Sequence, residues 1–199
     1  MFVKICGLTE FSHVEAAVDA GANAIGFLLS PSPRQVTVDR ARSLAAAVPD
    51  SVLTVGVFAQ EGPDEIRKIA TQVGLRAVQL HGAYTQADFA ALRDLPFAQV
   101  RAIAGSTEAD TRCGAFGEDY LIVDSPRPGS GEEWDWSCLP SRPTGKWLLA
   151  GGLRPDTVAR AIAQAKPWGV DVSSGVEKTR GVKDPSLIRR FVAAARCAQ

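Results

Sequence analysis

Short apolar runs recur along this chain at near-regular spacing, with more polar stretches between them. Most of the runs carry apolar residues at consecutive positions, which is typical of strands buried on both faces. Eight runs follow this pattern, at residues 2–6, 23–29, 52–58, 76–81, 98–104, 120–124, 146–152 and 169–175. The pattern therefore predicts eight short strands.

Several of the stretches between these runs carry the start and stop signals of helices. Thr9 is a candidate N-cap, and Val14, Ala17 and Val18 fall on one face of a helix that Gly21 can close. The further start signals are Asp39, Asp64 with Glu65, Pro155 and Pro185, and the further stop signals are Pro49 and Gly74. Because strands and helices alternate, we expect a parallel sheet.

Two arrangements of an alternating α/β chain compete, a closed (β/α)8 TIM barrel and a doubly wound open sheet. The strand count of eight favours the barrel, and no GxGxxG follows the first strand, where a dinucleotide-binding fold would carry one. A chain of 199 residues is shorter than the ~250 residues typical of such barrels, so its helices and loops must be short. We predict one α/β barrel domain over residues 1–199, with one long connection at 125–136.

The charge balance excludes some classes of partner. Lys plus Arg and Asp plus Glu both number 22, and no run of five or six like charges occurs, so we expect no nucleic-acid partner and no membrane contact. The apolar runs are far shorter than the ~20 residues that span a bilayer, and the N-terminus has no secretory signal pattern.

Cysteine usage indicates the compartment. The four cysteines are scattered without a CxxC pair, and only His13 and His81 accompany them, which argues against a zinc site and against a disulfide framework. We therefore predict a soluble cytoplasmic protein with reduced thiols.

Candidate chemical groups follow from the barrel prediction, because catalytic residues of such barrels gather at the carboxyl ends of the strands. Cys6, Arg34, His81 and Asp124 stand at or just beyond those ends. Each has an ordinary alternative: a buried thiol that packs like a small apolar group, a solvated loop charge, a hydrogen-bonded strand end and a capping acid. Taken singly, these residues leave both interpretations open.

Glycines at the ends of the last two strands are more informative together. Gly151 and Gly152 end the seventh strand, and Ser173, Ser174 and Gly175 end the eighth. Barrels often bind phosphate at these two loops, because glycine lets backbone N–H groups approach an anion and serine adds a hydroxyl donor. The two loops predict a phosphate site, with plain turns as the alternative.

A set of motifs spread over essentially the whole chain resembles the phosphoribosylanthranilate isomerases of the tryptophan pathway. The motifs are KICGLT at 4–9, GFLLSPSPRQV at 26–36, VGVF at 55–58, VQLHG at 78–82, IVDS at 122–125, GSGEEWDW at 129–136, LAGGLRPDTV at 149–158, GVDVSSGVE at 169–177 and GVKD at 181–184. KICG and DVSSGVE are individually distinctive. Two departures from the family pattern are Gln35, where an aromatic residue is common, and the proline-rich form of the loop that begins at Ser125.

The resemblance implies a cofactor-independent aldose–ketose isomerase without a metal. Such enzymes convert N-(5'-phosphoribosyl)anthranilate to 1-(2-carboxyphenylamino)-1-deoxyribulose 5-phosphate by an Amadori rearrangement. It implies that Cys6 is the general base, that Asp124 is the general acid and that Arg34 binds the anthranilate carboxylate. The remaining implied substrate-binding residues are Gly151, Gly152, Ser174 and Gly175 at the phosphate, with His81 and Asp171 in supporting positions. The expected partner is a small-molecule substrate, and the expected assembly is a monomer or a homodimer.

The two proposed catalytic groups differ in what they need at neutral pH. A thiol with an ordinary pKa of ~8.5 can be deprotonated near pH 7, whereas an ordinary aspartate is almost wholly ionised there. Asp124 therefore needs a raised pKa to donate a proton, and we expect a bell-shaped pH profile.

Three alternatives stay open at this point. A related phosphosugar isomerase of the histidine pathway usually pairs two aspartates, which the cysteine in the first strand disfavours. A non-catalytic phosphosugar-binding barrel is disfavoured by the presence of both Cys6 and Asp124. A redox or thiol-nucleophile enzyme is disfavoured because Cys6 has no resolving cysteine near it in the sequence.

Overall fold

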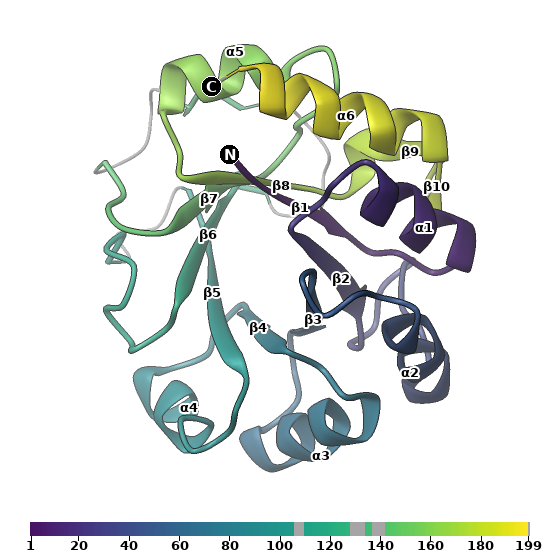
Figure 1. Ribbon diagram of the computed structural model, residues 1–199. Helices are drawn as coiled ribbons and strands as arrows, with labels where there is room; N and C mark the ends of the chain where they lie inside the picture. The colour runs from purple at the N-terminus through teal and green to yellow at the C-terminus, as the bar shows by residue number, and fades with distance from the viewer. Residues whose placement is uncertain (106–109, 128–133, 137–141, 199) are drawn as a thin grey trace.

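Eight parallel strands close into a barrel in the order in which they occur in the chain (Figure 1). The computed structural model describes residues 1–105, 110–127, 134–136 and 142–198. The strands are β1 (Phe2–Cys6), β2 (Ala24–Leu28), β3 (Leu53–Phe58), β4 (Ala77–His81), β5 (Ala98–Ala104), β6 (Tyr120–Asp124), β7 (Trp147–Leu149) and β8 (Gly169–Val172). Pairing of β8 with β1 closes the barrel. The predicted TIM barrel is confirmed, and the doubly wound alternative is wrong.

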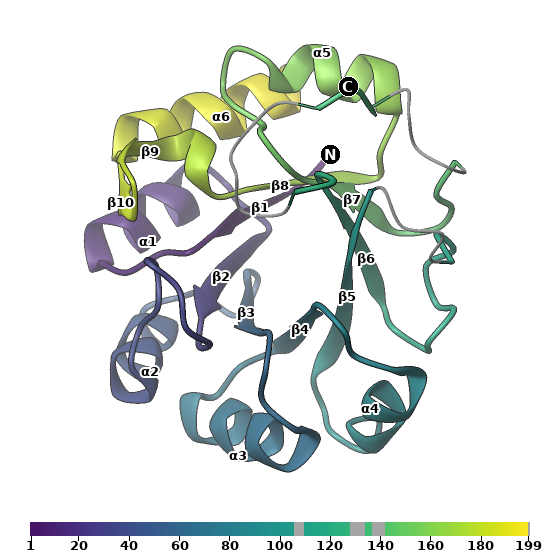
Figure 2. The ribbon, with the colours of Figure 1, turned by 180° about the vertical axis from the view of Figure 1, so that it is seen from behind.

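Helices surround the barrel on its outside (Figures 1 and 2). They are α1 (Phe11–Asp19), α2 (Val38–Ala46), α3 (Pro63–Val73), α4 (Gln86–Ala91), α5 (Val158–Ala165) and α6 (Pro185–Cys197). The signals predicted for α3 are confirmed, since Asp64 and Glu65 lie in its first turn and Gly74 ends it in a left-handed conformation. None of the helices in the described ranges is long and apolar enough to cross a membrane.

Some predicted helix starts are displaced from the observed ones. The N-cap of α1 is Glu10 rather than Thr9, and α2 begins after Thr37, whose side chain accepts a hydrogen bond from the Arg40 N–H. Helix α5 begins at Val158, because residues 155–157 form a separate turn in which the Arg154 N–H donates to Thr157 Oγ1. Pro185 does open α6, as predicted.

Strands β7 and β8 are shorter than the apolar runs that predicted them. Gly151 and Gly152 have φ values of 84° and 65°, which a strand does not allow, so β7 ends before them. After β8, Ser174–Val176 forms one turn of 3-10 helix, η2, followed by the short antiparallel pair β9 (Glu177–Thr179) and β10 (Val182–Lys183). Both views show this pair near the start of α6 and beside α1 (Figures 1 and 2).

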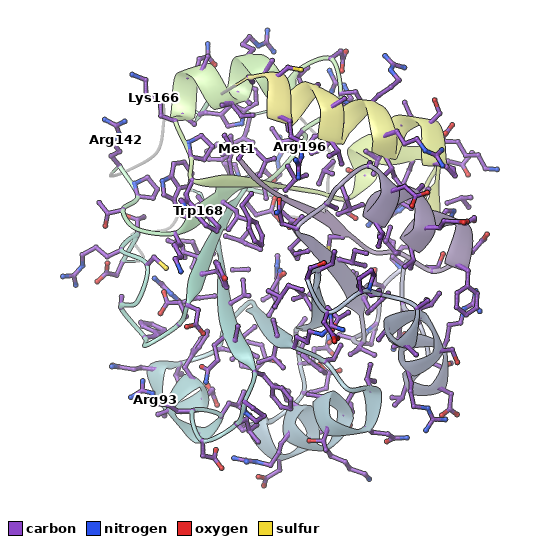
Figure 3. The ribbon with its side chains drawn as sticks, in the orientation of Figure 1. Met1, Arg93, Arg142, Lys166, Trp168 and Arg196 are labelled. Atoms are coloured by element: carbon purple, nitrogen blue, oxygen red, sulfur yellow. The ribbon has the colours of Figure 1, made fainter. Side chains whose placement is uncertain are left out.

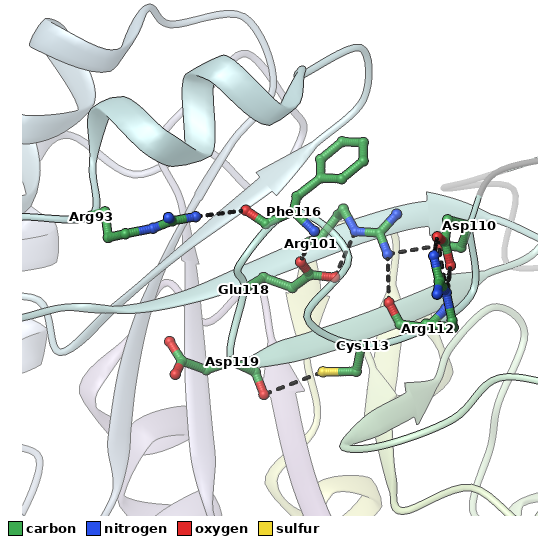
Figure 4. A network of polar contacts seen from close by, with 8 residues as sticks. All are labelled: Arg93, Arg101, Asp110, Arg112, Cys113, Phe116, Glu118 and Asp119. Carbon is green, nitrogen blue, oxygen red and sulfur yellow. Dashed lines mark hydrogen bonds and ion pairs between the residues drawn. The ribbon is translucent and has the colours of Figure 1, made fainter.

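The connection from β5 to β6 differs from the predicted alternation, because its described residues, 105 and 110–119, contain no helix. A side-chain network holds this segment instead (Figure 4). Arg101 donates from Nε to Glu118 Oε1 over 2.7 Å and from Nη2 to the carbonyl oxygens of Asp110 and Arg112. The Arg101 guanidinium also lies 4.6 Å from the centre of the Phe116 ring. This buried network covers the outside of β5 where a helix was expected.

The barrel interior changes character from one end to the other. Its middle is filled by small and branched apolar side chains: Ala24, Val55, Ala77, Val100, Ala102, Ile122, Leu148 and Ala150. Toward the amino-terminal end, Phe2 stacks on Trp168 at 4.8 Å and on Tyr120 at 5.7 Å, and Trp168 is labelled in Figure 3. Aromatic rings therefore fill this end, and polar interior side chains gather at the opposite end.

Candidate active site

The carboxyl ends of the strands surround a cavity of about 330 Å³, here called the main cavity. Cys6, Arg34, His81, Asp124 and Asp171 all line it. Cys6, His81 and Asp124 are the last residues of β1, β4 and β6. Five side chains predicted from five separate parts of the sequence thus face one space.

A second cavity, of about 80 Å³, adjoins the first and is here called the glycine-lined cavity. Gly151, Gly152, Ser174 and Gly175 line it. Arg34, Asp124, Ser173 and Asp171 line both cavities. The residues predicted for phosphate binding therefore lie next to those predicted for proton transfer.

The Cys6 thiol lies at the rim of the interior, packed against β2. A side chain on Gly26 would bring its Cβ within 2.7 Å of Cys6 Sγ, so glycine at this position makes room for the thiol. Only 6% of Cys6 is exposed. Burial raises the pKa of the Cys6 thiol, and the nearby Lys4 ammonium opposes that rise.

The Asp124 carboxyl lies across the barrel mouth at the end of β6. Burial raises its pKa above the ordinary value for aspartate, although the Ser125 N–H, which donates to Oδ1 over 2.7 Å, and His81 oppose the rise. A raised pKa keeps more of this group protonated near neutral pH. The environment of Asp124 therefore raises its pKa, which is the change that a general acid needs.

Arg34 is held in a charged cluster with Glu177 and Lys183. Its Nε and Nη2 donate to the two carboxylate oxygens of Glu177 over 2.6 and 3.1 Å, and Lys183 Nζ lies 2.7 Å from Glu177 Oε1. Although burial opposes it, these partners and the Gly181 N–H lower the pKa of Glu177 to about 2. An ionised Glu177 thus fixes both cations at the wall of the site.

Glu177 and Lys183 were not among the predicted site residues. They stand in the motifs GVDVSSGVE and GVKD, but spacing along the sequence does not show that β9 and β10 fold back against Arg34, 143 residues away. Lys4 and Gln79 were missed as well. Lys4 pairs with Asp171 at 3.0 Å, and Gln79 lines the main cavity with a buried Oε1 that has no hydrogen-bond partner in the described part of the chain.

The loops after β7 and β8 pack so closely that glycine is required in them. A Cβ on Gly175 would lie 1.7 Å from the Leu153 carbonyl oxygen, and a Cβ on Gly151 would lie 2.5 Å from the Ser125 nitrogen. The first contact joins the loops after β7 and β8, and the second joins the loop after β7 to the residue that follows β6.

Gly175→Ala is expected to lower the free energy of unfolding by more than about 2 kcal/mol, because the Leu153 backbone must move to admit the methyl group. Gly62→Ala is the matched control, since a Cβ there meets no atom within 4 Å. Urea denaturation of both variants measures the difference. Equal stability of the two variants would contradict the close packing of these loops.

Metal-ligating side chains do not cluster within the described ranges: no group of three or more His, Cys, Asp or Glu there could hold a metal ion. The three cysteines described by the structure, Cys6, Cys113 and Cys197, are free thiols. Cys113 lies in a turn beside the start of β6 and Cys197 at the end of α6, both away from the carboxyl ends of the strands, whereas Cys138 lies outside the described residues.

Comparison with known proteins identifies the family. Residues 3–194 match the family of N-(5'phosphoribosyl)anthranilate (PRA) isomerases. The N-(5'-phosphoribosyl)anthranilate isomerase of Pseudomonas fluorescens is 42% identical over 97% of both chains. The crystal structure of TrpF from Jonesia denitrificans superposes with a TM-score of 0.92 at 45% identity, over 100% of this chain and 98% of that one.

A further solved relative was crystallised with a ligand. It is a phosphoribosyl anthranilate isomerase in complex with reduced 1-(o-carboxyphenylamino)-1-deoxyribulose 5-phosphate, with 34% identity, a TM-score of 0.86 and 99% coverage of both chains. The chain therefore belongs to the family of N-(5'-phosphoribosyl)anthranilate isomerases, the isomerases of tryptophan biosynthesis.

Proposed function

We propose that this enzyme performs an Amadori rearrangement with Cys6 as general base and Asp124 as general acid. The observation that carries the proposal is the shared main cavity, which a buried thiol on β1 and a half-buried carboxyl of raised pKa on β6 both line. Strands β7 and β8 separate β1 from β6 around the barrel, so the two groups reach a ligand from different sides.

The proposed reaction moves protons in three steps. Asp124 gives a proton to the furanose ring oxygen, the C1'–O bond breaks, and the anthranilate nitrogen forms a protonated Schiff base. The Cys6 thiolate then removes the proton from C2', and the electron pair forms the C1'–C2' double bond of an enolamine. C1' then takes a proton from solvent and O2' loses its proton to solvent, which gives the ketone, so the substrate and the product are isomers. Proton exchange with solvent restores the protonated Asp124 and the Cys6 thiolate.

Binding groups at two ends would hold the sugar between the acid and the base. The phosphate fits the glycine-lined cavity, with backbone N–H groups of Gly151, Gly152 and Gly175 and the Ser174 hydroxyl as donors. The anthranilate carboxylate would bind the Nη1 edge of Arg34, because Glu177 occupies Nε and Nη2. The product-like ligand bound to the solved relative carries both a phosphate and a carboxyphenyl group, so a ligand of this class has an anion for each of the two binding regions.

His81 and Asp171 are proposed as supporting residues. His81 lines the main cavity at the end of β4, within electrostatic reach of Asp124. Asp171 lines both cavities and is paired with Lys4. The cytoplasmic location stays a prediction, as does the assembly as a monomer or a homodimer.

Arg34→Met is expected to raise KM by about 10- to 100-fold with a smaller change in kcat, because a charged hydrogen bond to the substrate carboxylate is lost. Steady-state kinetics on the variant test this result. Arg42→Met removes an exposed arginine of α2 and is the control. A fall in kcat with an unchanged KM would contradict the binding role of Arg34.

Turnover is the test of the proposed function as a whole. Purified protein is mixed with freshly prepared N-(5'-phosphoribosyl)anthranilate, and the loss of substrate fluorescence is followed against a protein-free blank. Because substrate and product have the same mass, carbon NMR must show the new ketone at C2'. Folded protein that forms no ketone would refute the proposal.

A further inference from the structure

A buried ion pair lies inside the barrel on the same interior face as Cys6. Lys4 precedes Cys6 by two residues on β1, so both side chains point into the interior. Asp171 is the residue of β8 that pairs with Lys4 in the sheet, and Lys4 Nζ lies 3.0 Å from Asp171 Oδ1. The exposed fractions of Lys4 and Asp171 are only 2% and 9%.

Stability alone does not account for this pair. Removing two charges from water costs free energy that their attraction barely offsets, and an apolar pair of similar volume often serves stability as well or better. The middle of the same barrel is indeed filled with alanine, valine, isoleucine and leucine. Because the pair carries full charges beside the Cys6 thiol, it changes the pKa of that thiol.

The two charges act on Cys6 in opposite directions. Burial is the largest influence and raises the pKa of the thiol; the Lys4 ammonium lowers the pKa, and the Asp171 carboxylate raises it. Burial alone would lower the pKa of Lys4 itself, but Asp171 and Cys6 together raise the pKa above its ordinary value. Lys4 therefore stays an ammonium at neutral pH.

Other charged and titratable groups also face the thiol or its cavity. They are Arg34 and Lys183 from the charged cluster, with their partner Glu177, and His81 and Asp124 from the main cavity. Arg34 and Lys183 are both bound to the Glu177 carboxylate, which offsets one of their two positive charges. Of the cations, Lys4 has the largest influence on the thiol.

We propose that Lys4 and Asp171 are positioning residues that set the thiolate fraction of Cys6, with Lys4 increasing it and Asp171 decreasing it. The role of this setting in catalysis rests on the proposed function, in which the thiolate removes the C2' proton. Neither residue needs to touch the reacting carbons for the effect. Replacing Lys4 and replacing Asp171 should change the thiolate fraction of Cys6 in opposite directions. Loss of packing alone would not produce opposite changes.

The test is alkylation of Cys6 by iodoacetamide over roughly pH 6 to 10, with each cysteine peptide quantified by mass spectrometry. The thiolate attacks the iodoacetamide carbon, a carbon–sulfur bond forms and iodide leaves, so the rate reports the thiolate fraction. Lys4→Met is expected to slow alkylation of Cys6 at pH 7 by about tenfold or more, and Asp171→Asn to accelerate it by a few-fold to about tenfold.

Two internal controls accompany the test. The exposed Cys197 at the end of α6 is alkylated in the same samples, and its rate should stay the same in all variants. Lys68→Met makes the same chemical change on the exposed face of α3 and should leave the Cys6 rate unchanged. A change in either control would show a general effect of charge or folding and would overturn the proposal.

Lys4→Met leaves the Asp171 carboxylate buried without its partner, so this variant is compared with the double variant Lys4→Met/Asp171→Asn. The double variant removes both charges, and its Cys6 rate should lie between those of the single variants. Circular dichroism confirms folding. The proposal is overturned if Asp171→Asn and the double variant, both folded, leave the rate unchanged, or if the two single variants shift it in the same direction. Because no substrate is present, this outcome is independent of whether Cys6→Ser abolishes turnover.

Discussion

Replacing Cys6 by serine is expected to lower kcat by about 10²- to 10⁴-fold and to leave KM nearly unchanged. A serine hydroxyl fills almost the same space beside Gly26, but its pKa lies far above that of a thiol, so it rarely ionises at neutral pH. Steady-state kinetics measure both constants. In the proposed mechanism kcat falls because removal of the C2' proton becomes slower.

The control for Cys6→Ser is Cys197→Ser, which makes the same change at an exposed thiol at the end of α6. This variant should turn over at the wild-type rate. If Cys6→Ser also retained the wild-type kcat, the thiol would have no part in proton transfer and the base would have to be another group.

Asp124→Asn is expected to lower kcat by a similar factor, about 10²- to 10⁴-fold, because an amide cannot deliver the proton that opens the ring. It should also change the shape of the pH profile. In the wild type the active form needs both a Cys6 thiolate and a protonated Asp124, so kcat rises with pH as Cys6 ionises and falls at higher pH because Asp124 is no longer protonated. Burial raises the pKa of Asp124 and so increases the fraction of this active form. The residual activity of the variant should lack the falling limb.

The control for this second variant is Asp94→Asn, in which the changed carboxylate is exposed and bound to Arg67. We expect its pH profile to match that of the wild type. A falling limb that persisted in Asp124→Asn would assign the acid to a different residue, and His81 in the same cavity would be the next candidate to test.

The positions of the candidate catalytic residues could be predicted because barrel closure makes the strand ends converge. The apolar run FVKIC predicted β1 with both of its ends, and YLIVD did the same for β6. Once the strands are parallel and closed, their last residues share one rim, so Cys6 and Asp124 meet without any sequence proximity. The glycines after β7 and β8 could be placed at the same rim for the same reason.

The electrostatic partners could not be predicted in this way. Lys4 and Asp171 stand 167 residues apart and Arg34 and Glu177 stand 143 apart, and each pair depends on a specific register or hairpin. Lys4 is the one charged residue of the apolar run FVKIC, and a charge there more often points to solvent than into a barrel. Lys4 and Asp171 are buried because the sheet closes around them, and the hydrophobic periodicity of the sequence does not predict this burial.

The β5–β6 connection shows a second limit of the sequence pattern. The rule that strands and helices alternate predicted a helix there, but the pairing of Arg101 with Glu118 covers the outside of β5 with a loop instead. A buried ion pair leaves no hydrophobic periodicity to read, so the segment had no distinctive signal. Because Arg101 points outward while Ala102 and Ala104 face the interior, this difference leaves the candidate site unchanged.

In the proposed mechanism a thiol and a carboxyl act from separate strands on one sugar whose phosphate is held beside β7 and β8. A crystal structure of this protein with reduced 1-(o-carboxyphenylamino)-1-deoxyribulose 5-phosphate would show this arrangement. We expect the phosphate to lie against Gly151, Gly152, Ser174 and Gly175, with Cys6 Sγ and the Asp124 carboxyl both in contact with the sugar chain. A ligand bound with its phosphate at Arg34, or with either group out of contact with the sugar, would contradict the proposed mechanism.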